Sequence, residues 1–318
     1  MALREQRLDN SFMNDLDNKT NNKVGNKAES KASIAGSAVI LLMQVRSTVG
    51  FIPAFGQHCA QTGIDITSFE ECRVNDTLYL RVEVSLSELI SSSHVLKESL
   101  SKFLEPFDVS LDIIAEQRLQ RLALVLGTHT PVIEDIIARV KERRLVPLDI
   151  AFIAAMDVDI ENTANRYGIP FFALPKANGL ELENKCTELN KRYRPDLLGI
   201  AGIDHVFSAP FHSKTKAPLF GVQSGFVPAV SGSPKVQFDF EWARQFGARI
   251  MLGSSFFYSA KVEGHAIIEQ QAIDLSSQVN SSELKLKQAQ IESSLFLTSL
   301  TKIADHRVLR TANRCIVF

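Results

Sequence analysis

The chain has 318 residues, a length that suits about two domains at roughly 100 to 200 residues each. Its 35 Lys and Arg residues nearly balance its 36 Asp and Glu residues, so no bulk charge attracts nucleic acid or an anionic membrane. The composition is 45% hydrophobic, and no apolar run reaches the ~18 residues of a membrane span. The four cysteines form no CxxC pair, which argues against a disulfide framework and a zinc site. We therefore expect a soluble cytoplasmic protein without a metal, whose partner is a small-molecule substrate.

Residues 1–34 differ from the rest of the chain, because they are rich in Asn and charged residues and hold almost no apolar pairs. Such a stretch cannot bury enough surface to offset the entropy lost on ordering it. It has no apolar core of a secretory signal, and its Asp and Glu argue against a mitochondrial transit peptide. We predict a disordered N-terminal tail, with a partner-binding arm as the alternative.

Residues 35–116 predict a ferredoxin-like βαββαβ domain. The segment 78–86 alternates apolar residues with Tyr79, Arg81, Glu83 and Ser85, which is typical of a half-buried strand. Gly63 stands where a glycine would end a helix. In chain order, the predicted elements are a strand at Ala38–Met43, a helix at Val49–Thr62, strands at Ile64–Cys72 and Leu78–Leu86, a helix at Leu86–Phe107 and a strand at Val109–Ile114.

Residues 117–318 predict a Rossmann-like domain with a mostly parallel sheet. Its strands are almost entirely apolar and alternate with helices, which indicates a sheet covered on both faces. In such sheets ligands bind beyond the carboxyl ends of the strands. The predicted elements are strands at Leu122–Gly127, Leu148–Ala155, Pro170–Leu174 and Asp196–Ala201, with helices at Val132–Val140, Ile160–Tyr167 and Glu181–Tyr193.

Several short segments, taken together in order, resemble the formyltetrahydrofolate deformylase family. They are Tyr167–Phe171, Phe226–Ala229, Ile267–Gln270 and Ala312–Phe318, behind the βαββαβ unit. The resemblance spans about residues 38 to 318. It implies an ACT-type domain followed by a formyltransferase-type domain, a tetrahydrofolate derivative as the bound compound, and a homo-dimer or homo-tetramer. The implied activity is hydrolysis of 10-formyltetrahydrofolate to formate and tetrahydrofolate.

The positions that the resemblance assigns to catalysis carry other residues in this chain. The family's catalytic Asn, His and Asp fall on Gly221, Gln223 and Glu263, and a further family His falls on Phe257. Hydrolysis of a formyl group needs a donor for the developing oxyanion and a group that exchanges protons near neutrality. Gly221 has no side-chain donor, and the amide of Gln223 exchanges no proton near pH 7. We therefore predict that ordinary deformylase chemistry is lost.

The predicted pocket also departs from the family's folate-binding segment. Where the family has Ala-Arg-Tyr-Met, this chain has Ala201 followed by Gly202, Ile203 and Asp204, which argues against folate binding. We expect the pocket to be lined by Gly202, Ile203, Asp204, Ser224, Phe226 and Phe257.

Three polar residues, Gln223, Glu263 and His265, are the candidate catalytic groups of a rebuilt site. For His265 a loop histidine without a role is the alternative. A Ser224 nucleophile lacks the Gly-x-Ser-x-Gly elbow. Metal ligation by His58 with Cys59, or by His205 and His212 with Asp204, has no recognised spacing. The arginines near the C-terminus, Arg307, Arg310 and Arg314, are interpreted as a solvated basic face.

Three functions therefore stay open. The first is an enzyme repurposed for a different small formyl or carbonyl compound in a specialised biosynthetic pathway. The second is a genuine formyltetrahydrofolate deformylase. The third is a non-catalytic ligand-binding or regulatory relative.

Overall fold

The structure is a computed structural model, and it describes residues 38–46, 49–86, 93–114, 119–127, 133–142, 148–175, 179–203, 205, 207–225, 245–259, 265–276, 279–311 and 314–318. The predicted tail at 1–34 lies outside these residues, as do Asp204, Phe226 and Glu263 among the candidate site residues. Within the described part of the chain, no helix is both long and apolar enough to cross a membrane.

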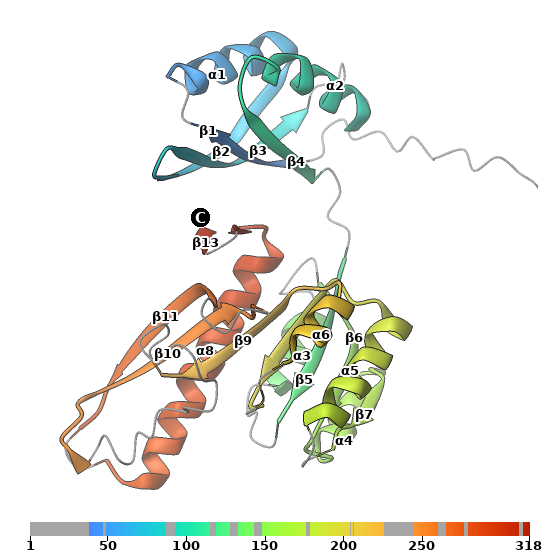
Figure 1. The fold of residues 1–318 in the computed structure, drawn as a ribbon, viewed down its shortest axis with the longest axis vertical. Helices are drawn as coiled ribbons and strands as arrows, with labels where there is room; N and C mark the ends of the chain where they lie inside the picture. The colour runs from blue at the N-terminus through green and yellow to red at the C-terminus, as the bar shows by residue number, and fades with distance from the viewer. Residues whose placement is uncertain are drawn as a thin grey trace, which may run out of the picture. The chain divides into compact units, whose positions relative to one another are not determined.

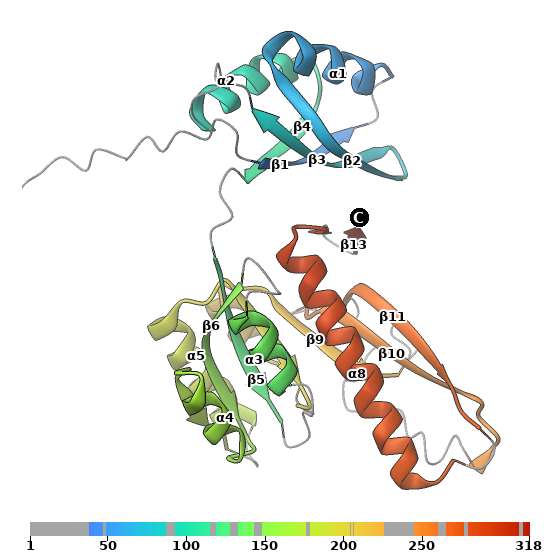
Figure 2. The same cartoon turned by 180° about the vertical axis from the view of Figure 1, so that it is seen from behind.

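The first sheet has four antiparallel strands in the order β2-β3-β1-β4 (Figure 1). Its helices α1 and α2 lie together on one face, as Figures 1 and 2 both show. Apolar side chains of both helices and of the inward strand positions form its core. The left-handed Gly63, with φ of 75°, ends α1 as predicted. The elements are β1 (Ala38–Arg46), α1 (Phe51–Thr62), β2 (Ile64–Val74), β3 (Thr77–Leu86), α2 (Ser93–Leu104) and β4 (Val109–Ile114), which confirms the βαββαβ prediction.

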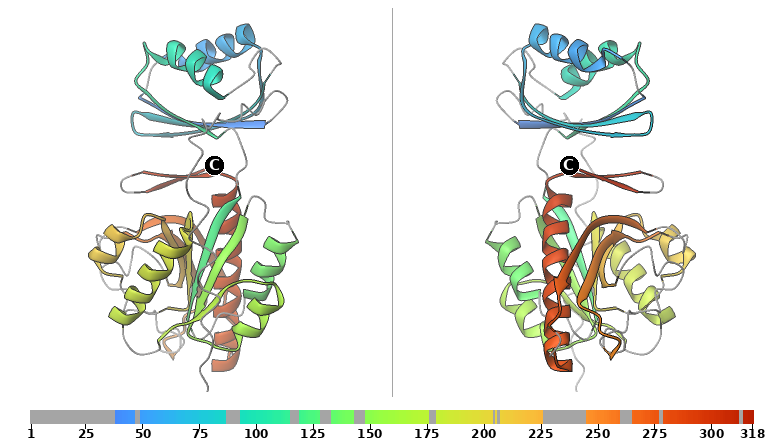
Figure 3. Two further views of the ribbon diagram at one scale, coloured as in Figure 1. Left: turned by 90° about the vertical axis from the view of Figure 1, so that its right-hand side faces the viewer. Right: turned by 90° about the vertical axis from the view of Figure 1, so that its left-hand side faces the viewer.

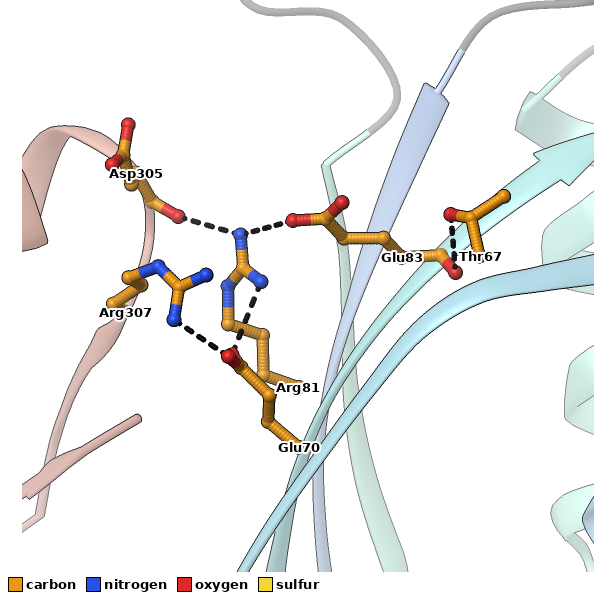
Figure 4. Close-up of polar contacts among 6 residues, drawn as sticks. All are labelled: Thr67, Glu70, Arg81, Glu83, Asp305 and Arg307. Carbon is orange, nitrogen blue, oxygen red and sulfur yellow. Dashed lines mark hydrogen bonds and ion pairs between the residues drawn. The ribbon is translucent and has the colours of Figure 1, made fainter.

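The polar side of β3 is more buried than its alternating pattern predicts. Tyr79 and Arg81 are only 7% and 2% exposed, although both stand at the polar positions of the pattern. For Arg81 the reason is a long-range contact, because its guanidinium donates a 2.9 Å hydrogen bond to the backbone oxygen of Asp305 (Figure 4). The alternating pattern identifies only the apolar face of the strand. It cannot show that the other face contacts a residue 224 positions later in the chain.

The second sheet has seven strands in the order β11-β10-β9-β8-β5-β6-β7. Strands β7, β6, β5, β8 and β9 are parallel, whereas β10 and β11 run antiparallel. The elements that match the prediction are β5 (Gln120–Leu126), α3 (Ile133–Lys141), β6 (Leu148–Ala155), α4 (Ile160–Arg166), β7 (Phe171–Ala173), α5 (Gly179–Tyr193) and β8 (Leu197–Ala201). Beyond them the structure adds α6 (Ala209–Lys214), β9 (Leu219–Ser224), β10 (Ile250–Phe257), β11 (Ala266–Asp274) and α8 (Ser281–Ala304).

Helices cover both faces of this sheet, as its apolar strands predict. Helices α5 and α6 lie on one face and α3 and α8 on the other (Figure 3). Each face has its own apolar core, one built with α5 and α6 and the other with α3, α4 and α8. The chain ends in a separate antiparallel pair, β12 (Val308–Arg310) and β13 (Cys315–Val317). Two sheets with separate cores fit the predicted domains at 35–116 and 117–318, whose boundaries stay predictions.

Candidate functional site

The carboxyl ends of β5 and β8 lie side by side at the point where the strand order reverses. The chain proceeds from β5 outward to β6 and later returns to β8 on the opposite side of β5. Gly127, just after β5, donates its backbone N–H to Ala201 at 2.9 Å. A Cβ atom at Gly127 would lie 1.5 Å from the backbone oxygen of Gly202, so only glycine permits this approach. A crevice of this kind is where open α/β sheets bind their ligands.

Strand β9 carries the two positions that the resemblance assigns to the family's catalytic Asn and His. Gly221 pairs with Phe256 of β10, and Gln223 pairs with Ser254. Because side chains alternate along a strand, positions 221 and 223 share one face of the sheet, and paired positions of β10 share it with them. This face, opposite α8, is the candidate site face.

Tyr258 occupies the space that a side chain at Gly221 would need. A Cβ atom at Gly221 would lie 2.6 Å from Cε2 of Tyr258 and 3.0 Å from its hydroxyl oxygen, and also 3.0 Å from the backbone oxygen of Ile200. Tyr258 is held at its backbone, since its N–H donates to Leu219 at 2.8 Å. The phenol hydroxyl therefore lies beside the point at which a side chain at position 221 would begin.

The ring of Tyr258 is enclosed by aromatic neighbours. Phe207 meets it edge to face at 5.6 Å between ring centroids, and Phe256 lies at 5.1 Å. Burial raises the pKa of Tyr258, so its hydroxyl keeps its proton and remains a hydrogen-bond donor. Tyr258 is absent from the residues predicted for the site. The available signal was a glycine at the Asn position, which leaves room for a large residue elsewhere.

His265 lies on the same face as Tyr258. Its ring stacks on Phe256 at 4.6 Å with an angle of 13° between planes, and it meets Tyr258 edge to face at 5.5 Å. Its Nδ1 is buried and has no hydrogen-bond partner among the described residues. Burial, and after it the charge of His212, lower the pKa of His265. The imidazole is therefore neutral near pH 7 and able to accept a proton.

Phe257 and Ser224 lie on the opposite face of the sheet, against α8. Phe257 is 4% exposed and belongs to the core that contains Phe296 of α8. Ser224 is 1% exposed, and its hydroxyl donates to the carboxylate of Glu292 in α8. Neither side chain faces the space beside Gln223, and a hydroxyl buried in this way is closed to an incoming substrate. On the site face, the neighbour Phe256 takes the place at which Phe257 was predicted.

A buried carboxylate binds two residues, His205 and Ser208, that follow β8. Glu183 of α5 is 6% exposed and accepts hydrogen bonds from Nε2 of His205 at 2.9 Å, from the backbone N–H of Ser208 at 2.6 Å and from its hydroxyl at 2.5 Å. Burial opposes the charge of Glu183, but the hydrogen bonds from Ser208 and His205 outweigh it and hold the pKa of this carboxyl below its ordinary value. Ser208 in turn caps α6 by accepting from the N–H of Phe211.

Of the remaining predicted pocket residues, the structure describes only Gly202 and Ile203. Gly202 and Ile203 follow β8 directly, and Ile203 packs against the core beneath α5 and α6. Asp204, Phe226 and Glu263 lie outside the described residues. Among the residues that the structure describes, no three His, Cys, Asp or Glu side chains are grouped so that they could hold a metal ion.

Known proteins resemble this chain over most of its length. A curated formyltetrahydrofolate deformylase from Synechocystis sp. is 26% identical over 282 residues, which cover 87% of this chain and 97% of that protein. The crystal structure of a formyltetrahydrofolate deformylase from Pseudomonas syringae has a TM-score of 0.77 at 17% identity, covering 88% of this chain and 94% of that one. No family model matches the chain.

About two thirds of the chain also resembles a group of shorter proteins. Glycinamide ribonucleotide transformylase 1 from Symbiobacterium toebii has a TM-score of 0.55 at 16% identity, and covers 64% of this chain and 96% of its own. The chain thus combines a formyltransferase-type α/β fold with a βαββαβ unit. The two curated relatives that it resembles over 87% of its length, at 26% and 22% identity, are formyltetrahydrofolate deformylases.

Proposed function

We propose that this protein is a repurposed relative of formyltetrahydrofolate deformylase that acts on a different small formyl or carbonyl compound. The observation that carries the proposal is the phenol of Tyr258, whose hydroxyl oxygen lies 3.0 Å from the Cβ position of Gly221. The donor that the family takes from Asn is thus replaced by a donor from another strand end. The ring also fills space beside Gly221, which favours a small substrate over a pteridine.

The proposed chemistry is attack of water on a carbonyl carbon. His265, neutral near pH 7, accepts a proton from the water, and the hydroxyl of Tyr258 donates to the oxygen that becomes negative. Gln223, which shares a face of β9 with Gly221, orients the polar end of the substrate, because its amide both donates and accepts hydrogen bonds. Glu263, which lies outside the described residues, stays a candidate catalytic group predicted from the sequence.

The first experiment compares formate release from 10-formyltetrahydrofolate by this protein and by a deformylase of the family. Loss of one oxyanion donor costs about 10²–10³ in rate, and general acid-base catalysis contributes about 10²–10⁴. Because these losses are not fully additive, we expect turnover roughly four orders of magnitude below the control. Comparable turnover would instead establish the second candidate function, a genuine deformylase, which the curated relatives favour by their name.

The second experiment uses 4-nitrophenyl formate, a small formyl ester whose leaving group absorbs light. Water adds to the formyl carbon, the bond to the phenol oxygen breaks, and formate, nitrophenolate and protons are released. We expect Tyr258→Phe, which removes only the hydroxyl, to slow this reaction by about 10²–10³. His265→Gln should slow it by about 10²–10⁴ and abolish the dependence on a group titrating below pH 7. Full activity in both variants contradicts the proposed roles, and an inert wild type supports the non-catalytic alternative.

A further inference from the structure

A cluster of charged side chains joins β2 and β3 to the turn that follows α8. The Arg81 guanidinium donates to Glu70 at 3.2 Å, pairs with Glu83 at 2.8 Å and reaches the backbone oxygen of Asp305 at 2.9 Å. Arg307 donates to the second carboxylate oxygen of Glu70 at 2.6 Å, so that both arginines share one carboxylate (Figure 4). We call these five residues the arginine cluster.

The arginine cluster is buried enough to fix the turn at 305–307. The side chain of Arg81 is 2% exposed, whereas those of Glu70, Glu83 and Arg307 are 27–33% exposed. A guanidinium removed from water is strongly unfavourable unless it is paired, and here both terminal nitrogens of Arg81 have partners, whereas its buried Nε has none among the described residues. One of its acceptors is a backbone oxygen of the turn, so a displaced turn would leave the buried charge short of a partner.

The turn leads directly into the terminal hairpin, which we define as β12 and β13. Arg307 precedes β12, and its backbone oxygen accepts from the N–H of Phe318 at 2.9 Å. Three paired positions hold the two strands together, from Val308 with Val317 to Arg310 with Cys315. The position of the hairpin is therefore set at its beginning by the arginine cluster.

The far end of the same hairpin contacts the backbone beside both proposed site residues. Arg310 donates to the backbone oxygen of Tyr258 at 3.4 Å and lies over the ring of Phe257 at 5.6 Å. The thiol of Cys315 donates to the backbone oxygen of Ala266, next to His265, at 3.5 Å. One small element thus holds the two chain positions from which Tyr258 and His265 extend.

We infer that the terminal hairpin is a positioning element for Tyr258 and His265, and that Arg81 sets its place from the first sheet. Arg81 is accordingly a positioning residue, since it touches neither ring and acts through the turn at 305–307 and Arg310. The catalytic roles of the two rings rest on the proposed function. Independently of those roles, a change at Arg81 should alter the surroundings of His265.

The test measures the full-length protein by NMR, with labelled histidine, and by amide hydrogen exchange. The His265 ring signal is assigned by its absence in His265→Gln. In Arg81→Met, which keeps an apolar stem without the guanidinium, the His265 signal should shift and its pKa should rise toward the ordinary value. Amides of 308–310 and 315–317, and that of Tyr258, should exchange at least about tenfold faster as the hairpin opens.

Three further variants separate positioning from a general loss of stability. Arg310→Gln removes the exposed contact at the far end of the hairpin, and it keeps the test available if Arg81→Met does not fold. Because both changes act through one element, the double variant should move the His265 signal no further than the larger single effect. Arg81→Lys, which retains the charge but not the planar fork, should restore part of the wild-type signal.

A matched control lies in the same part of the chain. Lys102→Met breaks the exposed pair with Glu98, at 3.2 Å in α2, and should leave the His265 signal and hairpin exchange unchanged. An unchanged His265 signal in folded Arg310→Gln, or in folded Arg81→Met, overturns the inference. Neither measurement depends on turnover, so failure of the proposed chemistry and failure of the positioning role are separately visible.

Discussion

Adding a single methyl group at Gly221 tests whether Tyr258 fills the space beside β9. In Gly221→Ala the new Cβ would meet Cε2 of Tyr258 at 2.6 Å and the backbone oxygen of Ile200 at 3.0 Å. Overpacking of a well-filled site costs about 1–3 kcal/mol, while replacing glycine by alanine recovers about 0.4–1 kcal/mol by restricting the unfolded chain. We therefore expect the free energy of unfolding to fall by about 1–2 kcal/mol.

The assay is a double-mutant cycle with Tyr258→Ala, measured by urea-induced unfolding. Removal of the ring from the wild type should cost about 3–5 kcal/mol, as for other buried aromatic residues. In that background the added methyl has lost its main obstacle, so Gly221→Ala should be close to neutral. The coupling energy between the two positions should then be about 1–2 kcal/mol in favour of the double variant.

A matched glycine serves as the control for the effect of the substitution itself. Gly56 lies within α1, and a Cβ atom there would meet nothing within 4 Å. Gly56→Ala should stabilise the protein by about 0.5–1 kcal/mol, because alanine is the better helix former. If Gly221→Ala behaves like Gly56→Ala, or if its effects add to those of Tyr258→Ala within about 0.5 kcal/mol, the ring does not occupy this space.

Two pH-dependent predictions follow from the titratable groups near the site. The pKa of Glu183 is lowered in the folded chain, so its charged form stabilises the fold above the ordinary value near 4.5, and this contribution is lost as the pH falls through the lowered value. Glu183→Gln should therefore reduce stability at pH 7 and flatten the acid side of the stability curve, measured by thermal unfolding; an unchanged acid slope contradicts this. The pKa of His265 is lowered from 6.5, so the unfolded chain binds its proton first and stability falls as the pH decreases below that value. His265→Gln should remove part of this slope, and an equal slope in both proteins would show that the ring is not buried.

The parts of the fold that the sequence predicts are those whose signals are local. The apolar runs that become β5, β6 and β8 are complete within their own segments, and Gly63 marks the end of α1 at the residue itself. The strands β9 to β11 and the helix α8 are not among the predicted elements. Helix α8 carries its apolar residues without a strong one-sided pattern over 24 residues, because it packs under three strands and also receives polar contacts such as that of Glu292.

For the candidate site, the sequence predicts which of the family's catalytic side chains are absent, but not which side chain takes their place. The positions of Gly221 and Gln223 follow from short segments of the chain, and their chemistry follows from their side chains. The replacement donor does not, because Tyr258 reaches Gly221 through the pairing of β9 with β10, in which Phe256 stands opposite Gly221. The sequence-based prediction places Phe257 of β10 in the site, which is one residue out of register. In the structure Phe257 points to the opposite face of the sheet and packs in the core against α8.

The arginines near the C-terminus have partners that are distant in sequence. Arg310 and Arg314 are exposed, as the predicted solvated basic face requires, and Arg310 also lies over the ring of Phe257, whereas Arg307 is half-buried and paired with Glu70. Neither partner lies near them in sequence, so no window along the chain contains the pair. Arg81 is buried beside Arg307, on the side of β3 where the alternating pattern predicts exposed side chains. A buried arginine is stable only while its acceptors stay in place, because its charge has lost the stabilisation by water. One of the three acceptors of Arg81 is the backbone oxygen of Asp305, and the hairpin that follows it contacts the backbone of Tyr258 through Arg310.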